Sequence, residues 1–162
     1  MTTTRLDIAR GFADKHGMDL HAPLVIGGNY VSATEHHGVV YVSGQVPRVG
    51  TTVTALGRVG ETVTLQQAQA AAEVCALRVL AILEQQFGLQ RIDRVLKINV
   101  FTQSAADFTQ QSEVADAASN LLAAVLGSHS GPHARTSVGV YQLPKNAAVE
   151  LDATVALTAT QP

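Results

Sequence analysis

Cysteine, aromatic residues and excess charge are all scarce in this 162-residue sequence. It holds one cysteine and no tryptophan, aromatic residues make up 4% of the chain, and the formal net charge is −2. A single cysteine excludes an internal disulfide framework and is typical of a reducing compartment. Few aromatic side chains and no basic excess argue against a surface that binds nucleic acid or an anionic membrane.

Long apolar runs and metal-ligand spacings are missing as well. No run approaches the roughly 18 residues of a membrane span, and the first residues lack the apolar segment of a signal peptide. We therefore expect a cytoplasmic protein without a membrane partner. The His36-His37 pair fits a solvated turn better than a metal site, because no second pair of ligands stands at a suitable spacing. We therefore expect no metal.

What the sequence does contain is typical of one globular domain. Hydrophobic residues make up 46% of the chain and charged residues 15%, and the length suits a single core. We expect residues 1–162 to form one domain, with an N-terminal helical extension at residues 1–20 and the core at residues 25–158.

Three segments show the period of an amphipathic helix. They are residues 4–17, 64–88 and 107–126. The second segment is the best defined, because Thr64 and Gln67 form a capping box and Gly88 stands where a helix would end. Its apolar stripe includes Cys75, which we interpret as a small buried residue rather than a catalytic thiol.

Apolar and β-branched residues alternate with polar ones in other segments, as in half-buried strands. Strands are predicted at residues 27–33, 39–43, 95–102, 138–140 and 149–157, with a hairpin turn at residues 35–38. The order of elements predicts a two-layer α+β fold, in which the two long helices cover one face of a mixed or antiparallel sheet. The other face would be exposed in a monomer, so we expect a homo-oligomer.

Residues 131–152 predict a strand, a tight turn and a second strand, and they carry two ionisable groups in fixed positions. Arg135 stands just before the first strand and Glu150 lies within the second, with the Pro and Asn of a reversing turn at residues 143–146. The two are either a functional pair or a structural ion pair between neighbouring strands. His133 is either an acid or base beside Arg135 or a loop histidine bound to a backbone partner, and we favour the second interpretation.

Several local strings are specific enough to compare with known families. They are Gly28-Asn29-Tyr30, Val42-Ser43-Gly44-Gln45-Val46-Pro47, Val100-Phe101 and, most specific, Arg135-Thr136-Ser137-Val138 followed by Leu143-Pro144 and Val149-Glu150. Together they resemble the RidA/YjgF family, also called the L-PSP endoribonuclease family, over roughly residues 25–157. The resemblance is closest to a longer subgroup with an N-terminal helix and a Gly-x-His-Ala-Arg string, here residues 131–135. It implies a chorismate-mutase-like fold and a homotrimer with clefts between subunits.

The resemblance also implies a chemistry that needs no cofactor. Its substrate would be a small carboxylate molecule, a reactive 2-imino acid hydrolysed to a 2-oxo acid and ammonia. Arg135 and Glu150 are the implied catalytic residues: the first would hold the substrate carboxylate with its guanidinium fork, and the second would position or activate a water. The implied substrate-binding residues, besides Arg135, are Tyr30, Ser43, Gly44, Ser137 and His133.

Two positions depart from the family pattern. Imine-hydrolysing members commonly have cysteine two residues after the arginine, where this chain has Ser137, and Ser112 stands near the place of an asparagine. Three functions therefore remain open. We predict the first, an imine or enamine hydrolase; the second is a non-catalytic module that binds a carboxylate metabolite in the same cleft. The third is an RNA-cleaving translation inhibitor, against which the acidic net charge and few aromatic residues argue.

Overall fold

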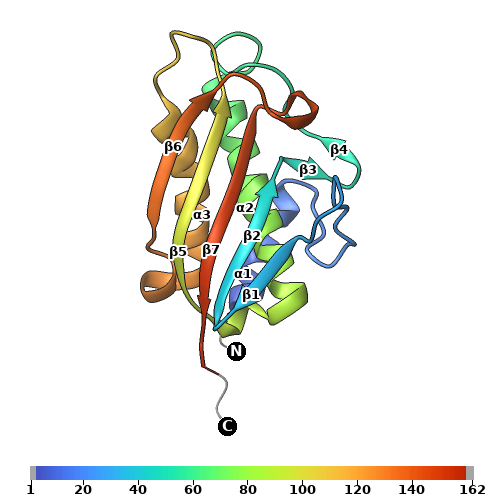
Figure 1. Cartoon of the computed structure of the whole chain (residues 1–162), viewed down its shortest axis with the longest axis vertical. Coiled ribbons are helices and arrows are strands. Elements are labelled where there is room, and N and C mark those ends of the chain that lie inside the picture. Colours follow the sequence, from blue (N-terminus) through green and yellow to red (C-terminus); the bar gives the residue numbers. More distant parts are fainter. Residues whose placement is uncertain (1–2, 160–162) are drawn as a thin grey trace.

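Five strands form a mixed sheet, and two shorter strands form a separate ribbon. The computed structural model describes residues 3–159. In chain order the elements are α1 (Arg5–Lys15), β1 (Ala33–His36), β2 (Val39–Gln45), β3 (Arg48–Val49), β4 (Thr52–Val53), α2 (Leu65–Phe87), the 3₁₀ turn η1 (Leu89–Arg91), β5 (Ile92–Gln103), α3 (Gln111–Ser130), β6 (Ala134–Val140), the 3₁₀ turn η2 (Pro144–Asn146) and β7 (Val149–Leu157). The main sheet has the order β1-β2-β7-β5-β6, and β3 pairs with β4 (Figure 1). The β5–β6 pair is parallel and the other described pairs are antiparallel.

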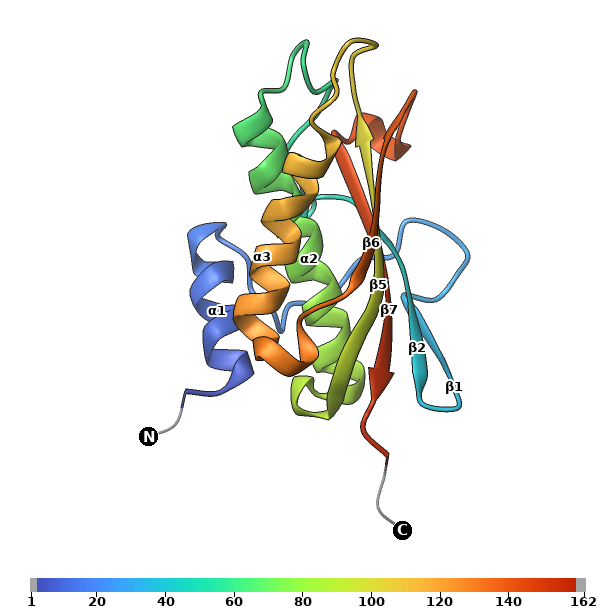
Figure 2. The ribbon, with the colours of Figure 1, turned by 90° about the vertical axis from the view of Figure 1, so that its left-hand side faces the viewer.

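The helices lie on one side of the main sheet. Figure 2 shows α2 and α3 against one face, and α1 beyond them on the side away from the strands. The predicted α+β arrangement is confirmed, and α1 adds an outer layer. Within residues 3–159 no helix covers the opposite face of the sheet. In the same part of the chain, no helix combines the length and hydropathy needed to cross a bilayer.

Capping residues set the ends of the helices. Thr4 and Asp7 form a capping box at the start of α1, and the one expected from Thr64 and Gln67 is confirmed at the start of α2. Gly88 follows α2 with a φ of 83°, a conformation that glycine adopts at no steric cost. These local signals set both ends of α2, and this long helix supplies most of one side of the core.

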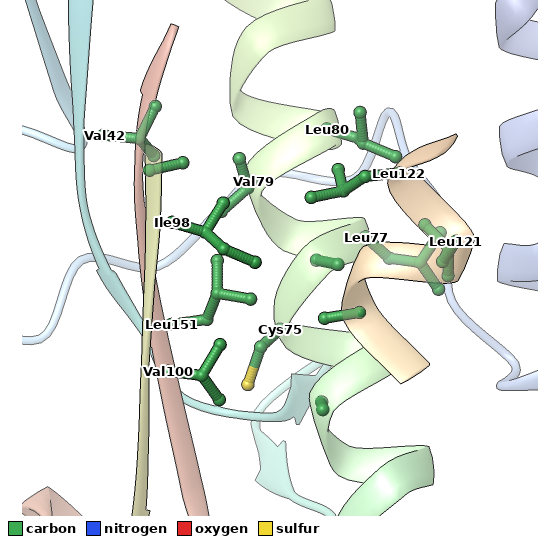
Figure 3. Close-up of a cluster of buried hydrophobic side chains, with 14 of the residues drawn as sticks. Val42, Cys75, Leu77, Val79, Leu80, Ile98, Val100, Leu121, Leu122 and Leu151 are labelled. Atoms are coloured by element: carbon green, nitrogen blue, oxygen red, sulfur yellow. The ribbon is translucent and has the colours of Figure 1, made fainter. Parts of the chain in front are cut away.

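The core lies between α2 and its two neighbouring layers. Figure 3 shows Cys75 and Val79 of α2 turned toward Leu151 of β7, while Leu80 lies close to Leu122 of α3. Cys75 is fully buried, as predicted. Burial raises the pKa of its thiol, so the group stays protonated and packs as a small apolar side chain.

Two predicted element boundaries are wrong. Residues 27–32 form bends rather than a strand, and β1 begins at Ala33, because the glycines and asparagine of this segment are poor strand formers. The second long helix begins at Gln111 rather than at residue 107, and Gly127 interrupts it with a φ of 84° before a last turn that ends at Ser130. The positive φ of Gly127 explains why the sequence signalled a helix end there.

The predicted pairing of the last two strands is also wrong. β6 and β7 both pair with β5 and not with each other, because η2 carries the chain past the end of β5 through positive-φ residues Lys145 and Asn146. Arg135 lies inside β6, where it is in register with Ile98. Arg135 and Glu150 are therefore on non-adjacent strands, and the possible ion pair between them does not form.

Candidate functional site

A β-bulge in β2 brings the backbone close to an acidic side chain. The β2–β7 register shifts between Val42 and Gln45, and the bulge contains Ser43 and Gly44. A Cβ atom on Gly44 would lie 3.0 Å from Cδ of Glu150 and would overlap its carboxylate. Glycine at this position is thus what allows the Glu150 carboxylate to lie against β2.

Glu150 occupies an outward-facing position of β7. Val149 and Leu151 on either side of it are buried in the core, so Glu150 points to the face of the sheet that the helices leave uncovered. It is half-buried, and desolvation, followed by the nearby charge of Asp152, raises the pKa of its carboxyl. A carboxyl group with a raised pKa is a stronger base than an exposed one and is a candidate for proton transfer.

Glu150 lines a small cavity, called the Glu150 cavity below. Its volume is about 210 Å³, below the ~300–1,000 Å³ of sites for drug-sized ligands. Members of residues 24–32 form one wall, and the rest comes from residues 44–48 at the bulge and just after it, part of α2, residues 144–145 and Glu150. Of the residues predicted from the sequence, the cavity brings together Tyr30, Gly44 and Glu150.

Ser43 does not line this cavity. Its Oγ donates a hydrogen bond to the carbonyl of Val31 at 2.7 Å, and its backbone N–H donates to the carbonyl of Ser32 at 2.9 Å. Ser43 therefore holds the loop of residues 24–32 against β2. The neighbouring Ser32 lines the cavity instead, and its Oγ accepts a hydrogen bond from Nε2 of Gln86 at 2.7 Å.

Sequence reasoning missed the cationic side of the cavity. Arg48, Arg78 and Lys145 all line it. Arg78 was overlooked because it falls in the apolar part of α2. The signal that could have found it is its isolation: it is the one charged residue in residues 74–83, and charged residues are rarely fully buried without a partner.

Arg135 belongs to a different group of side chains, the β6–α3 edge, made by Asp116, Ser119, His133 and Arg135. The Arg135 Nη1 donates to Oδ1 of Asp116 at 2.8 Å and to Oγ of Ser119 at 3.0 Å. Because Ile98, its neighbour in register, is buried under the helices, Arg135 lies on the helix side of the sheet. Arg135 and Glu150 thus lie on opposite faces of the sheet within one chain.

The other predicted residues near Arg135 also lie at or beside this edge. His133 is held from both sides, with Nδ1 2.6 Å from the carbonyl of Gly131 and Nε2 2.9 Å from Oγ of Ser119. The carbonyl can only accept, so Nδ1 carries the proton, and the expected backbone partner is confirmed. Ser137, two residues along β6, shares the face of Arg135. Ser112 is exposed on α3 and lines no part of the Glu150 cavity.

Comparison with known proteins identifies the family to which this chain belongs. A family model described as "Endoribonuclease L-PSP" matches residues 20–157. The chain belongs to this L-PSP family. Protein TCP17 of Trypanosoma cruzi is 44% identical over 142 residues, which cover 87% of this chain and 89% of TCP17. The family-model match begins after α1.

Solved structures agree with this assignment. The structure of Atu1372 from Agrobacterium tumefaciens, a protein of unknown function, has a TM-score of 0.83 and 39% identity, with 95% of each chain covered. The YjgF gene product of E. coli has a TM-score of 0.59 and 21% identity, covering 86% of this chain and 95% of YjgF. The resemblance to the RidA/YjgF family and its chorismate-mutase-like α+β fold, which the sequence suggested, is therefore confirmed.

Proposed function

We propose that this protein hydrolyses a small, reactive imine or enamine that bears a carboxylate. In this reaction a 2-iminium acid and one water give a 2-oxo acid and ammonium. The water oxygen bonds to the iminium carbon while a proton leaves the water, the nitrogen is protonated, and the C–N bond breaks. The reaction needs no redox partner, because the carbon keeps its oxidation state.

The observation that carries the proposal is the position of Glu150. Its half-buried carboxyl, with a raised pKa, lies against Gly44 in a cavity of about 210 Å³. As a carboxylate it can accept the proton of an attacking water and can lie beside a cationic iminium group. An iminium carbon is already electrophilic, so positioning the water and removing its proton supplies much of the required assistance.

We also propose that the protein works as a homotrimer in the cytoplasm, with its clefts between subunits. The uncovered face of the sheet supports an oligomer, because Tyr41 and Val138 on that face are 53% and 39% exposed. Since Arg135 and Glu150 lie on opposite faces in one chain, the predicted role of Arg135 would require Arg135 of a neighbouring subunit. Sedimentation-velocity centrifugation tests the assembly: a trimer is expected, and a monomer at all concentrations would contradict it.

A coupled assay tests the activity. A pyridoxal-dependent dehydratase generates 2-iminopropionate or 2-iminobutanoate in place, and release of the 2-oxo acid is followed with and without the protein. We expect acceleration with the wild-type protein and none with Glu150→Gln. Absence of acceleration by a folded wild-type protein, over several imino acids, would favour the second candidate, a module that binds a carboxylate metabolite without turnover.

The family's description suggests RNA cleavage as another candidate. The net charge of −2 provides no attraction for phosphates, and the Glu150 cavity is small for a nucleotide chain. Incubation of the protein with single-stranded RNA at low and high salt tests this candidate. We expect no cleavage and no salt-dependent binding.

A further inference from the structure

Gln103, the last residue of β5, is a buried polar side chain close to the Glu150 cavity. Its strand neighbour Phe101 is in register with Glu150 of β7, so these two side chains lie on the same face of the sheet, and Gln103 lies two residues further along that face. Gln103 is 1% exposed. A buried amide costs free energy unless hydrogen bonds compensate it, so its partners indicate its role.

The Gln103 side chain uses both ends of its amide. Nε2 donates to the carbonyl of Gly57 at 3.0 Å and to Oδ1 of Asn146 at 2.7 Å, and Oε1 accepts from the backbone N–H of Leu143 at 2.7 Å. Because a carbonyl can only accept and an N–H can only donate, these partners fix the orientation of the amide. Leu143 precedes η2 and Asn146 ends it, so Gln103 holds both ends of η2.

The backbone of η2 is strained and depends on these hydrogen bonds. Lys145 and Asn146 have φ values of 59° and 57°, in the left-handed region that residues other than glycine rarely adopt. Two such residues in succession persist only where the surrounding structure holds them. Gly57 also contributes, because its backbone N–H donates to the carbonyl of Asn146 at 2.9 Å. Without Gln103, most of this support would be lost.

η2 forms part of the wall of the Glu150 cavity. Pro144 and Lys145 line the cavity, and residues 147–149, which connect η2 to Glu150, are fully buried. The position of η2 therefore affects how far the Glu150 carboxyl is shielded from water. This shielding matters, because desolvation is the larger cause of the raised pKa of Glu150, followed by the charge of Asp152.

We propose that Gln103 is a positioning residue for Glu150: it holds η2 against the cavity and so keeps water away from the Glu150 carboxyl. This inference rests on the proposed hydrolysis, in which Glu150 accepts the proton of the attacking water. Gln103 does not itself line the cavity. Loss of its hydrogen bonds lets η2 relax, Pro144 and Lys145 withdraw from the wall, and Glu150 becomes hydrated. A hydrated carboxylate is a weaker base, so proton transfer slows.

Two variants and a matched control test the inference. Gln103→Met keeps the length of the side chain and removes all three of its hydrogen bonds. Asn146→Gly removes one of them, and glycine adopts the left-handed conformation at no steric cost, so this variant should fold even if Gln103→Met does not. His37→Gly is the control, because His37 is exposed, has a φ of 50° and lies outside the Glu150 cavity.

The direct measurement is the titration of the Glu150 carboxyl without substrate, by ¹³C NMR of its side chain, with Glu150→Gln to assign the resonance. Because burial raises the pKa of Glu150, we expect its titration to move to lower pH in Gln103→Met and, by less, in Asn146→Gly. His37→Gly should titrate as the wild type does. A loss of stability alone would not move the titration. An unchanged titration in folded Gln103→Met, or in Asn146→Gly if Gln103→Met does not fold, would overturn the inference.

The charges around Glu150 require one further variant. The charged and titratable groups near its carboxyl are Asp152 on β7, Arg48 on β3, Arg78 on α2, Lys145 on η2, and Tyr30. Lys145 moves with η2, and withdrawal of its positive charge would raise the pKa of Glu150, opposite to the effect of hydration. Lys145→Gly removes the ammonium group, permits the left-handed backbone and measures this contribution separately. A titration that moves to higher pH in Gln103→Met would overturn the inference.

Hydrolysis of 2-iminobutanoate, followed by release of the product 2-oxobutanoate, separates the inference from the proposed function. In Gln103→Met, kcat should fall by about tenfold, as expected for a small displacement in the wall of a reaction site, and the acid limb of the pH–kcat profile should move with the Glu150 titration. Wild-type turnover without a shifted titration in Gln103→Met would leave the hydrolase and remove the inference. A shifted titration without wild-type turnover would keep Gln103 as the residue that shields Glu150 and would remove the hydrolase. Neither turnover nor a shift would overturn both.

Discussion

The Glu150 cavity and the β6–α3 edge each contain an arginine, and the two arginines have opposite environments. At the edge, Arg135 has an aspartate at 2.8 Å and a hydroxyl at 3.0 Å, so its charge is compensated within the chain. In the cavity, Arg78 has an amide and a carbonyl as acceptors and no acid. An arginine that forms an ion pair between a strand and a helix stabilises their packing. An arginine beside a cavity that has no acidic partner can form an ion pair with an anion from outside the chain.

The difference between the two arginines shows that the residues that identify a family need not be the residues that line a cavity within one chain. Arg135 carries the most specific string of the family, and that string correctly indicated the fold. The three cations that line the Glu150 cavity, Arg48, Arg78 and Lys145, all lie outside that string. The two regions can be compared directly by substitution, because they share no side chain.

The largest effect is expected from Glu150→Gln. The amide keeps the shape of the side chain but cannot accept a proton from water, so kcat should fall by about 10²–10⁴-fold. Binding of 2-oxobutanoate should be retained, because the amide keeps the size of the side chain and the cavity stays open. The assay is steady-state hydrolysis of 2-iminobutanoate, with Glu113→Gln on the exposed surface of α3 as control. Wild-type turnover in Glu150→Gln would remove Glu150 from the reaction.

Gly44→Ala should have the next largest effect on the cavity. The new Cβ would overlap the Glu150 carboxylate, so the carboxylate must move. Displacement of a catalytic group by about 1 Å can cost up to about 10²-fold in rate, and we expect a loss between tenfold and that value. Gly11→Ala in α1 is the control, because nothing lies within 4 Å of its added Cβ. Unchanged kinetics in Gly44→Ala would contradict the close approach of the Glu150 carboxylate to Gly44.

Arg135→Gln should have a smaller effect on stability. It removes an ion pair in which the Asp116 side chain is 55% exposed, and such pairs contribute about 1 kcal/mol or less. Urea denaturation at a fixed protein concentration measures the change in unfolding free energy, and Asp116→Asn should cost a similar amount. A non-additive double variant would show that the two side chains interact. Loss of 2-oxobutanoate binding with full stability would instead support the role that the family resemblance implies for Arg135.

The sequence predicted the layers of the fold better than it predicted the site. Helical period and the Thr64 capping box gave α2, and alternation gave β7, because both signals are local. The pairing of β6 with β5 could not be predicted from a turn-like segment at residues 143–146, since the turn residues do not say which strand is the neighbour. Tyr30 and Gly44 were found through family strings, and Glu150 was found first through the alternation of its strand. Arg78 was missed because its meaning depends on burial and on the absence of a nearby acid, which only three-dimensional packing reveals.

Asp152→Asn should have the smallest effect, a shift in pH dependence. The charge of Asp152 contributes, after desolvation, to the raised pKa of Glu150. Glu150 acts as a base only when deprotonated, so turnover should fall as the pH drops through its pKa. Removal of the Asp152 charge lowers that pKa, and the acid limb of kcat should move to lower pH, while the desolvation that remains should keep it above the value of an exposed carboxyl.

The test of this shift is a comparison of pH–kcat profiles for the wild type and Asp152→Asn. Asparagine can still accept the hydrogen bond that Asn99 donates to Asp152 at 2.7 Å, so the strands should remain in register. Asp107→Asn, an exposed site before α3, is the control and should leave the profile unchanged. A shift to higher pH would contradict a base role for Glu150. An unchanged acid limb would mean that a different group, outside the Glu150 cavity, sets the pH dependence.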